Sequence, residues 1–206
     1  MNTTTKLFLG GINGVGKTTL ASLVQELRPL WQVVHVSKEY MKFLNLPEGA
    51  YDQLRSLPES SHRASLRQLV NNLLVAHADT PVVILDAHYV VFDQAEYPIL
   101  KVGEWIKEFD GLILVEAKAE DIDQRVHHDT LVGVRQRYMS SEASSRIGII
   151  EENLLYNRIM AQRVSDWFGV DLFIVSNANP RQAANEIINI IESSRAKGLK
   201  LNLCSN

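Results

Sequence analysis

Short apolar runs alternate along the chain with longer segments in which apolar residues recur at the spacing of a helix face. Five runs are rich in Val, Ile, Leu or Phe, as strands buried on both faces require: Lys6–Gly10, Gln32–Val36, Pro81–Asp86, Gly111–Glu116 and Leu172–Val175. The helical spacing predicts helices over Lys17–Leu30, Ser60–His77, Ala119–Arg125, Ser141–Phe168 and Pro180–Ser194. This alternation is typical of a parallel sheet covered by helices, so the sequence predicts an α/β fold.

Composition limits the domain count and the class of partner. The chain has 206 residues, of which 46% are hydrophobic, so we expect a single domain over 1–195 and a polar tail over 196–206. Its 21 basic and 24 acidic residues give a net charge of −3, which argues against general nucleic-acid binding and favours a small-molecule partner. A homo-oligomer is compatible with this composition.

The single cysteine and the N-terminal segment bear on location. Cys204 has no second cysteine with which to form an intramolecular disulfide. The first apolar run is too short for a signal peptide or a membrane span. We therefore expect a cytoplasmic protein without a membrane anchor.

The strongest chemical signal is GINGVGKT at residues 11–18, which satisfies the P-loop pattern G-x-x-x-x-G-K-[ST] between a predicted strand and a predicted helix. Glycines let the backbone N–H groups turn inward around a polyphosphate, at the positive end of the following helix. Lys17 can reach the terminal phosphates, and the Thr18 hydroxyl is placed to ligate the Mg²⁺ that accompanies ATP. The looser G-x-G-x-x-G dinucleotide pattern gives the GKT ending no role. The expected ATP-binding residues are Gly11, Asn13, Gly14, Val15, Gly16, Lys17, Thr18 and Thr19.

Two polar residues end the third predicted strand, VVILDAH. Asp86 falls at the carboxyl end of a central strand, where a carboxylate faces the ligand crevice of an open sheet, so we expect it beside the metal with Thr18. The competing interpretation of Asp86 is a helix or turn cap. His88 either binds a phosphate of the acceptor substrate or satisfies the backbone of the loop.

An arginine-rich segment follows the fourth predicted strand. Arg125, Arg135, Arg137 and Arg146 are concentrated where a strand–helix unit gives way to a long predicted helix, which predicts a lid over residues 127–146. A lid that closes arginines over the transferring phosphoryl group would stabilise its charge and exclude water, so Arg125, Arg135 and Arg137 are the expected catalytic partners of Lys17. The alternative is a solvated charged face.

Taken after GINGVGKTT, the segments DQLRSLP, VVILDAH, and RVHHD followed by RQR resemble the archaeal-type adenylate kinases, members of the P-loop nucleoside monophosphate kinases. The resemblance implies a three-layer P-loop kinase fold, with a five-stranded parallel sheet in the order 2-3-1-4-5, helices on both faces and a short lid. It also implies an acceptor-binding flap over residues 37–78 with Arg55 at the acceptor, ATP with Mg²⁺ as donor, and AMP as the favoured acceptor.

The expected function is therefore an ATP-dependent phosphotransferase that converts ATP and AMP to two ADP. Two alternatives remain open at this point. One is a P-loop kinase of another small metabolite, and the other is a nucleotide-binding interaction or regulatory module with weak ATPase activity. A GTPase is disfavoured because the chain has no N-K-x-D motif for guanine.

Overall fold

The computed structural model describes residues 4–92, 98–131 and 142–196, and its centre is a parallel sheet of five strands. The strands are β1 (Thr5–Gly10), β2 (Gln32–His35), β3 (Val82–Asp86), β6 (Gly111–Glu116) and β7 (Leu172–Ser176). They lie side by side in the order β2-β3-β1-β6-β7, and every adjacent pair is parallel. Counted along the chain, this is the order 2-3-1-4-5, so the predicted sheet is confirmed.

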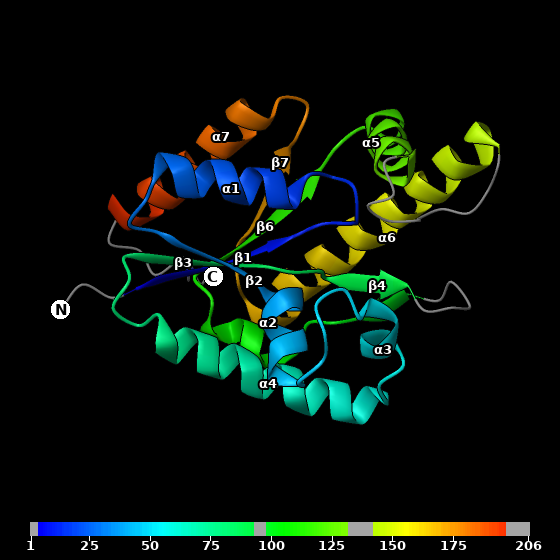
Figure 1. Ribbon diagram of the computed structural model, residues 1–206. Coiled ribbons are helices and arrows are strands. Elements are labelled where there is room, and N and C mark those ends of the chain that lie inside the picture. Colours follow the sequence, from blue (N-terminus) through cyan, green and yellow to red (C-terminus); the bar gives the residue numbers. More distant parts are fainter. Residues whose placement is uncertain (1–3, 93–97, 132–141, 197–206) are drawn as a thin grey trace.

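The helices cover both faces of the sheet (Figure 1). They are α1 (Lys17–Leu27), α2 (Val36–Phe43), α3 (Tyr51–Arg55), α4 (Glu59–Ala76), α5 (Ala119–Leu131), α6 (Ala143–Phe168), α7 (Pro180–Ala196) and the 3-10 helix η1 (Glu104–Glu108). A short antiparallel pair, β4 (Val90–Phe92) and β5 (Pro98–Leu100), forms a second sheet. All five expected helices are present.

Several boundaries differ from the sequence expectation. The second strand ends at His35, because Val36 already belongs to α2, a helix that was not expected. Helix α1 ends at Leu27, three residues before its predicted end, and α5 continues past Arg125 to Leu131. The helices α2, α3 and η1 and the β4–β5 pair are all additions in segments that the sequence analysis left unassigned.

Successive residues of the central strands point alternately into two hydrophobic cores, one on each face of the sheet, which explains why these strands are apolar. Leu7 and Leu9 of β1 point into a core shared with α1, α5 and α7, whereas Phe8 points into a core shared with α2, α4, η1 and α6. Phe8 packs there edge-on against Tyr89, with their ring centroids 4.8 Å apart. Helices thus cover the central strands on both faces, whereas Ile174 of the edge strand β7 is exposed.

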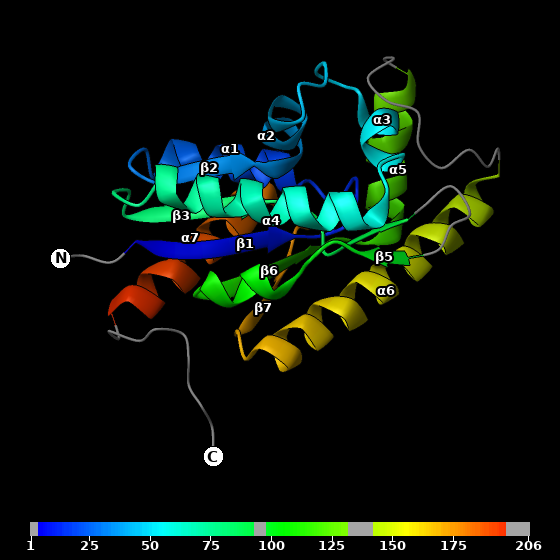
Figure 2. The same ribbon diagram turned by 90° about the horizontal axis from the view of Figure 1, so that it is seen from below.

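The carboxyl ends of the strands meet at one edge of the sheet. The residue pairing Leu9↔Asp86 and His35↔Asp86 brings the ends of β1, β2 and β3 to the same level. Figure 2 shows α3, α5 and the β4–β5 pair on the side toward which β1 runs. This edge is where open parallel sheets bind ligands, and the glycine-rich loop begins there.

Candidate active site

The loop between β1 and α1 has the backbone shape of a phosphate cradle. Gly14 and Gly16 have φ angles of +85° and +90°, in the left-handed region that favours glycine. A Cβ atom on Gly14 would lie 2.8 Å from Val126 Cγ2, and one on Gly16 would lie 2.4 Å from Asn177 Nδ2. Both the conformation and the space therefore require glycine at these two positions of the motif.

Helix α1 begins at Lys17, directly after Gly16 of the loop. Gly16 caps the helix without a side-chain hydrogen bond, and no acidic residue lies in the first turn. Thr18 and Thr19 are exposed on that turn. A helix end of this kind attracts an anion through its N–H groups and its dipole.

Lys17 lies across the loop that precedes it. Its side chain is buried, and Nζ donates to the carbonyl oxygens of Gly11 and Ile12 at 2.8 and 3.0 Å. The Lys17 ammonium is thus held at the loop by two neutral carbonyl oxygens. Phosphate oxygens are stronger acceptors for an ammonium than carbonyls are, so a phosphate in the cradle would compete well for it.

The outer side of the loop is braced by two residues from distant elements. Asn177, directly after β7, donates from Nδ2 to the Val15 carbonyl at 2.6 Å. Arg125 of α5 donates to the same carbonyl at 3.2 Å and to the Asn177 carbonyl at 3.2 Å. The structure therefore places Arg125 against the loop backbone, and its predicted catalytic role stays a prediction.

Sequence reasoning missed the role of Asn177 at this site. Asn177 belongs to the segment SNANP at residues 176–180, and no sequence motif indicates that its amide contacts Val15, 162 positions earlier in the chain. Asn177 is 1% exposed and its Oδ1 has no hydrogen-bond partner among the described residues. Its position behind Gly16 explains why the motif's second glycine is needed in this chain.

Two residues at the end of β3 face the same edge. Asp86 is buried, and its Oδ2 accepts a hydrogen bond from His35 Nδ1 at 2.8 Å. His88 Nδ1 donates to the Gly11 carbonyl at 2.9 Å, the same oxygen that Lys17 contacts. Of the two interpretations of His88, this contact corresponds to the one in which it satisfies the loop backbone. Its predicted acceptor-binding role stays a prediction.

The oxygen donors near the loop fit a Mg²⁺ ion that arrives with a nucleotide. Asp86 Oδ1 makes no hydrogen bond to a residue in the described ranges, and the Thr18 hydroxyl lies at the exposed start of α1. Within those ranges no cluster of three or more His, Cys, Asp or Glu side chains could hold a metal alone. Mg²⁺ commonly takes one or two protein oxygens and completes its shell with phosphates and water, which matches this donor set.

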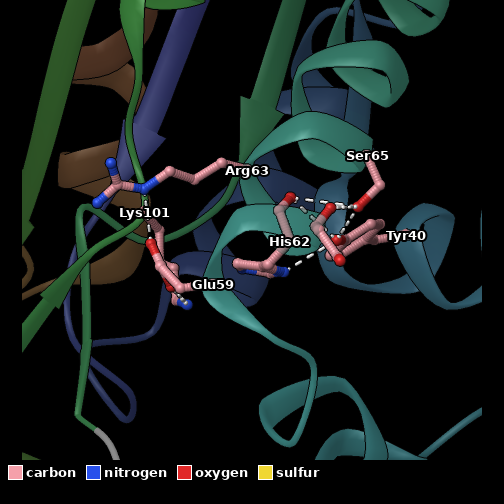
Figure 3. A network of polar contacts seen from close by, with 7 residues as sticks. Tyr40, Glu59, His62, Arg63, Ser65 and Lys101 are labelled. Carbon is pink, nitrogen blue, oxygen red and sulfur yellow. Dashed lines mark hydrogen bonds and ion pairs between the residues drawn. The ribbon is translucent and has the colours of Figure 1, made fainter.

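The predicted acceptor flap, residues 37–78, contains a polar network that links three segments (Figure 3). The Tyr40 hydroxyl of α2 lies 2.9 Å from His62 Nδ1 and 2.5 Å from Ser65 Oγ, both on α4. Glu59 of α4 pairs with Arg63 at 2.7 Å and with Lys101, directly after β5, at 3.5 Å. Figure 3 shows His62 between Tyr40 and the Glu59–Lys101 pair.

Burial lowers the pKa of two members of this network, His62 and Lys101. Desolvation and the nearby Lys101 charge lower the pKa of His62 to about 4, so the ring is neutral at pH 7. Burial likewise lowers the pKa of Lys101. Arg55 is the last residue of α3, and its side chain falls outside what the structure describes.

The predicted lid divides into three parts. Residues 127–131 are the end of α5 and residues 143–146 are the start of α6, whereas Arg135 and Arg137 lie outside the described residues. Arg146 forms two hydrogen bonds with Asp123 of α5, at 2.7 and 3.0 Å. This pairing lowers the pKa of Asp123 and joins the two helices that flank the predicted lid.

A five-stranded parallel sheet in this order, with a glycine-rich loop and lysine at its carboxyl edge, is the P-loop kinase fold. The family model described as an AAA domain matches residues 10–146, more than half of the chain, and the chain belongs to that family. No curated protein sequence matched the chain. None of the helices in the described ranges is long and apolar enough to cross a membrane.

Solved structures with the same fold include several small-molecule kinases. A shikimate kinase from Acinetobacter baumannii in complex with shikimate has a TM-score of 0.62 at 15% identity, covering 94% of this chain and 96% of that chain. A shikimate kinase from Aquifex aeolicus has a TM-score of 0.55 at 15% identity, with coverage of 93% and 98%. A sugar kinase from Janibacter has a TM-score of 0.55 at 14% identity, with coverage of 94% and 97%. Identities this low establish a shared fold.

Proposed function

We propose that this protein transfers the terminal phosphoryl group of ATP, with Mg²⁺, to a small phosphate-acceptor molecule. The observation that carries the proposal is the loop itself: left-handed Gly14 and Gly16, a start of α1 without a side-chain cap, and Lys17 lying across the loop. These features supply N–H donors and the Lys17 ammonium for a polyphosphate.

In this proposal each residue has a distinct task. The loop N–H groups hold the inner phosphates of ATP, and Lys17 exchanges its carbonyl partners for the terminal phosphate oxygens. Thr18 and Asp86 would hold Mg²⁺, which when bound neutralises charge on the phosphate oxygens. Arg125, Arg135 and Arg137 are the proposed further cations, acting on the charge of the transferring group from α5 and from the proposed lid over residues 127–146.

For the acceptor we propose a nucleoside monophosphate, with AMP first. The proposal is supported by the resemblance to archaeal-type adenylate kinases in the stretch that carries Arg55. A phosphate acceptor is already a nucleophile, so in-line positioning between the flap (residues 37–78) and the loop would suffice without a side-chain base. His88, which contacts the loop at the Gly11 carbonyl, is the second proposed acceptor contact.

A second candidate is a kinase of another small metabolite, such as a hydroxyl-bearing acid or sugar. It is favoured by the shared fold with a shikimate kinase and a sugar kinase. A nucleotide-binding module with little turnover is the remaining alternative.

A direct assay separates these functions. ADP release from ATP and Mg²⁺ would be measured against AMP, CMP, GMP, UMP and dTMP, and against shikimate and simple sugars. The proposal expects acceptor-dependent ADP release, fastest with AMP. Release that requires an alcohol would favour the second candidate, whereas ATP binding without release from any acceptor would favour the binding module and refute the phosphotransferase.

A further inference from the structure

His35 is a polar residue at the site edge that no motif marks. It is the last residue of β2, and in the parallel pairing of β2 with β3 it lies directly opposite Asp86. Opposite residues of neighbouring strands project to the same face of a sheet. The topology therefore brings the imidazole and the carboxylate together at the carboxyl edge, next to the end of β1.

The contact between the two side chains uses one atom of each. His35 Nδ1 lies 2.8 Å from Asp86 Oδ2, and it is the one hydrogen-bond partner of the Asp86 carboxylate within the described part of the chain. An ionised carboxylate only accepts hydrogen bonds, so Nδ1 carries the proton. This leaves Asp86 Oδ1 without a hydrogen bond from the same residues.

The exposures of the two side chains differ in a way that bears on function. The Asp86 side chain is 9% exposed and that of His35 is 30% exposed. The carboxylate therefore sits deep at the strand end, and the imidazole stands beside it toward solvent. A ring in this position restricts rotation of the carboxylate about its χ2 torsion, which is otherwise a broad torsion.

We infer that His35 is a positioning residue for Asp86: it binds Oδ2 and thereby turns Oδ1 toward the cation that accompanies the nucleotide. The inference rests on the proposed function, because it assigns a cation partner to Asp86. Outer-shell hydrogen bonds to a carboxylate ligand fix its orientation, and their loss typically weakens metal binding by about 10- to 100-fold.

Two variants separate the hydrogen bond from the shape of the ring. His35→Phe keeps a planar ring but has no N–H donor, whereas His35→Asn keeps an N–H close to the position of Nδ1 in a smaller side chain. Calorimetric titration with ATP, with and without Mg²⁺, gives the factor by which Mg²⁺ tightens nucleotide binding. Thermal melting of each variant without nucleotide shows whether the fold is retained.

We expect Mg²⁺-free ATP affinity to be unchanged in both variants. The tightening by Mg²⁺ should fall at least about 10-fold in His35→Phe and recover in His35→Asn. If Mg²⁺ tightened ATP binding as much in His35→Phe as in the wild type, the positioning role of His35 would be refuted and the proposed function would stand. Absence of ATP binding to the wild type would overturn the proposed function, and the role of His35 with it.

A measurement without metal or nucleotide tests the geometry independently. Long-range ¹H–¹⁵N NMR distinguishes the two neutral tautomers of a histidine ring. The wild-type protein should show His35 protonated at Nδ1, and Asp86→Ala should abolish that preference. A wild-type ring protonated at Nε2 alone would contradict the hydrogen bond on which the inference depends.

Discussion

Lowering the pH from 8 to 5 is expected to destabilise the fold through His62. The ring is 7% exposed and its pKa falls from 6.5 to about 4, because burial and then the Lys101 charge disfavour the protonated form. Between pH 6.5 and about 4, His62 is therefore protonated in the unfolded chain and neutral in the folded one. Stability from this group is complete above pH 6.5 and is lost progressively as the pH falls toward 4.

The size of the effect follows from the same shift. The linkage relation gives a loss of about 2 kcal/mol at pH 5, and screening at the solvent-facing side of the network reduces the expectation to about 1–2 kcal/mol. Urea denaturation at pH 8, 7, 6 and 5 measures it as the change in unfolding free energy. His62→Gln cannot take up the proton, so its stability should depend less on pH over this range.

His128→Gln is the matched control, because His128 is exposed on α5. This variant should keep the wild-type pH dependence, whereas carboxylate titration at lower pH affects all three proteins alike. Equal pH dependence of the wild type and His62→Gln between pH 8 and 5 would refute the reasoning, because it would mean that the ring titrates equally in both states.

Glycine substitutions test the close packing of the loop and of the strand that precedes it. Gly16 and Gly49 share a φ of +90°, so Gly49→Ala is a matched control for Gly16→Ala. Only at Gly16 would the added Cβ meet another atom, Asn177 Nδ2 at 2.4 Å. We therefore expect Gly16→Ala, and not Gly49→Ala, to weaken ATP binding by about 10-fold or more in a calorimetric titration. Equal ATP affinity in the two variants would contradict the tight approach of Asn177. Gly10→Ala would place a Cβ 2.1 Å from the Tyr89 ring, which is fully buried, and should lower stability by about 1–3 kcal/mol in urea denaturation. A Gly10→Ala protein as stable as the wild type would show that the ring can move aside.

The strands were predictable from the sequence because most of their residues are apolar and pack into the two cores, whereas the strand order was implied by the family resemblance. Gly111–Glu116 was predicted with its observed bounds, and its residues alternate between the two cores. The loop was equally predictable, since a left-handed backbone at Gly14 and Gly16 leaves a direct trace in residue type.

Short elements and paired side chains were not predictable in the same way. Helix α2 has only two turns and starts without a break after β2, so its buried residues Val36, Tyr40 and Met41 give too little periodicity. The His35–Asp86 and Asn177–Val15 contacts depend on strand order and on packing. Their partners are separated in the sequence by 51 and 162 positions, respectively. No local pattern encodes such pairs.

The central claim, phosphoryl transfer from ATP directed by the loop, is tested most directly with Lys17→Met. Lys17 is buried and Met has a similar length and no charge, so the variant should keep the wild-type melting temperature. Lys107→Met removes an exposed lysine of η1, outside both the proposed flap and the proposed lid, and serves as the control. ADP release with Mg²⁺ and the best acceptor would be measured for all three proteins. We predict a loss of about 100-fold or more in Lys17→Met and wild-type turnover in Lys107→Met. Wild-type turnover in a folded Lys17→Met protein would contradict the account.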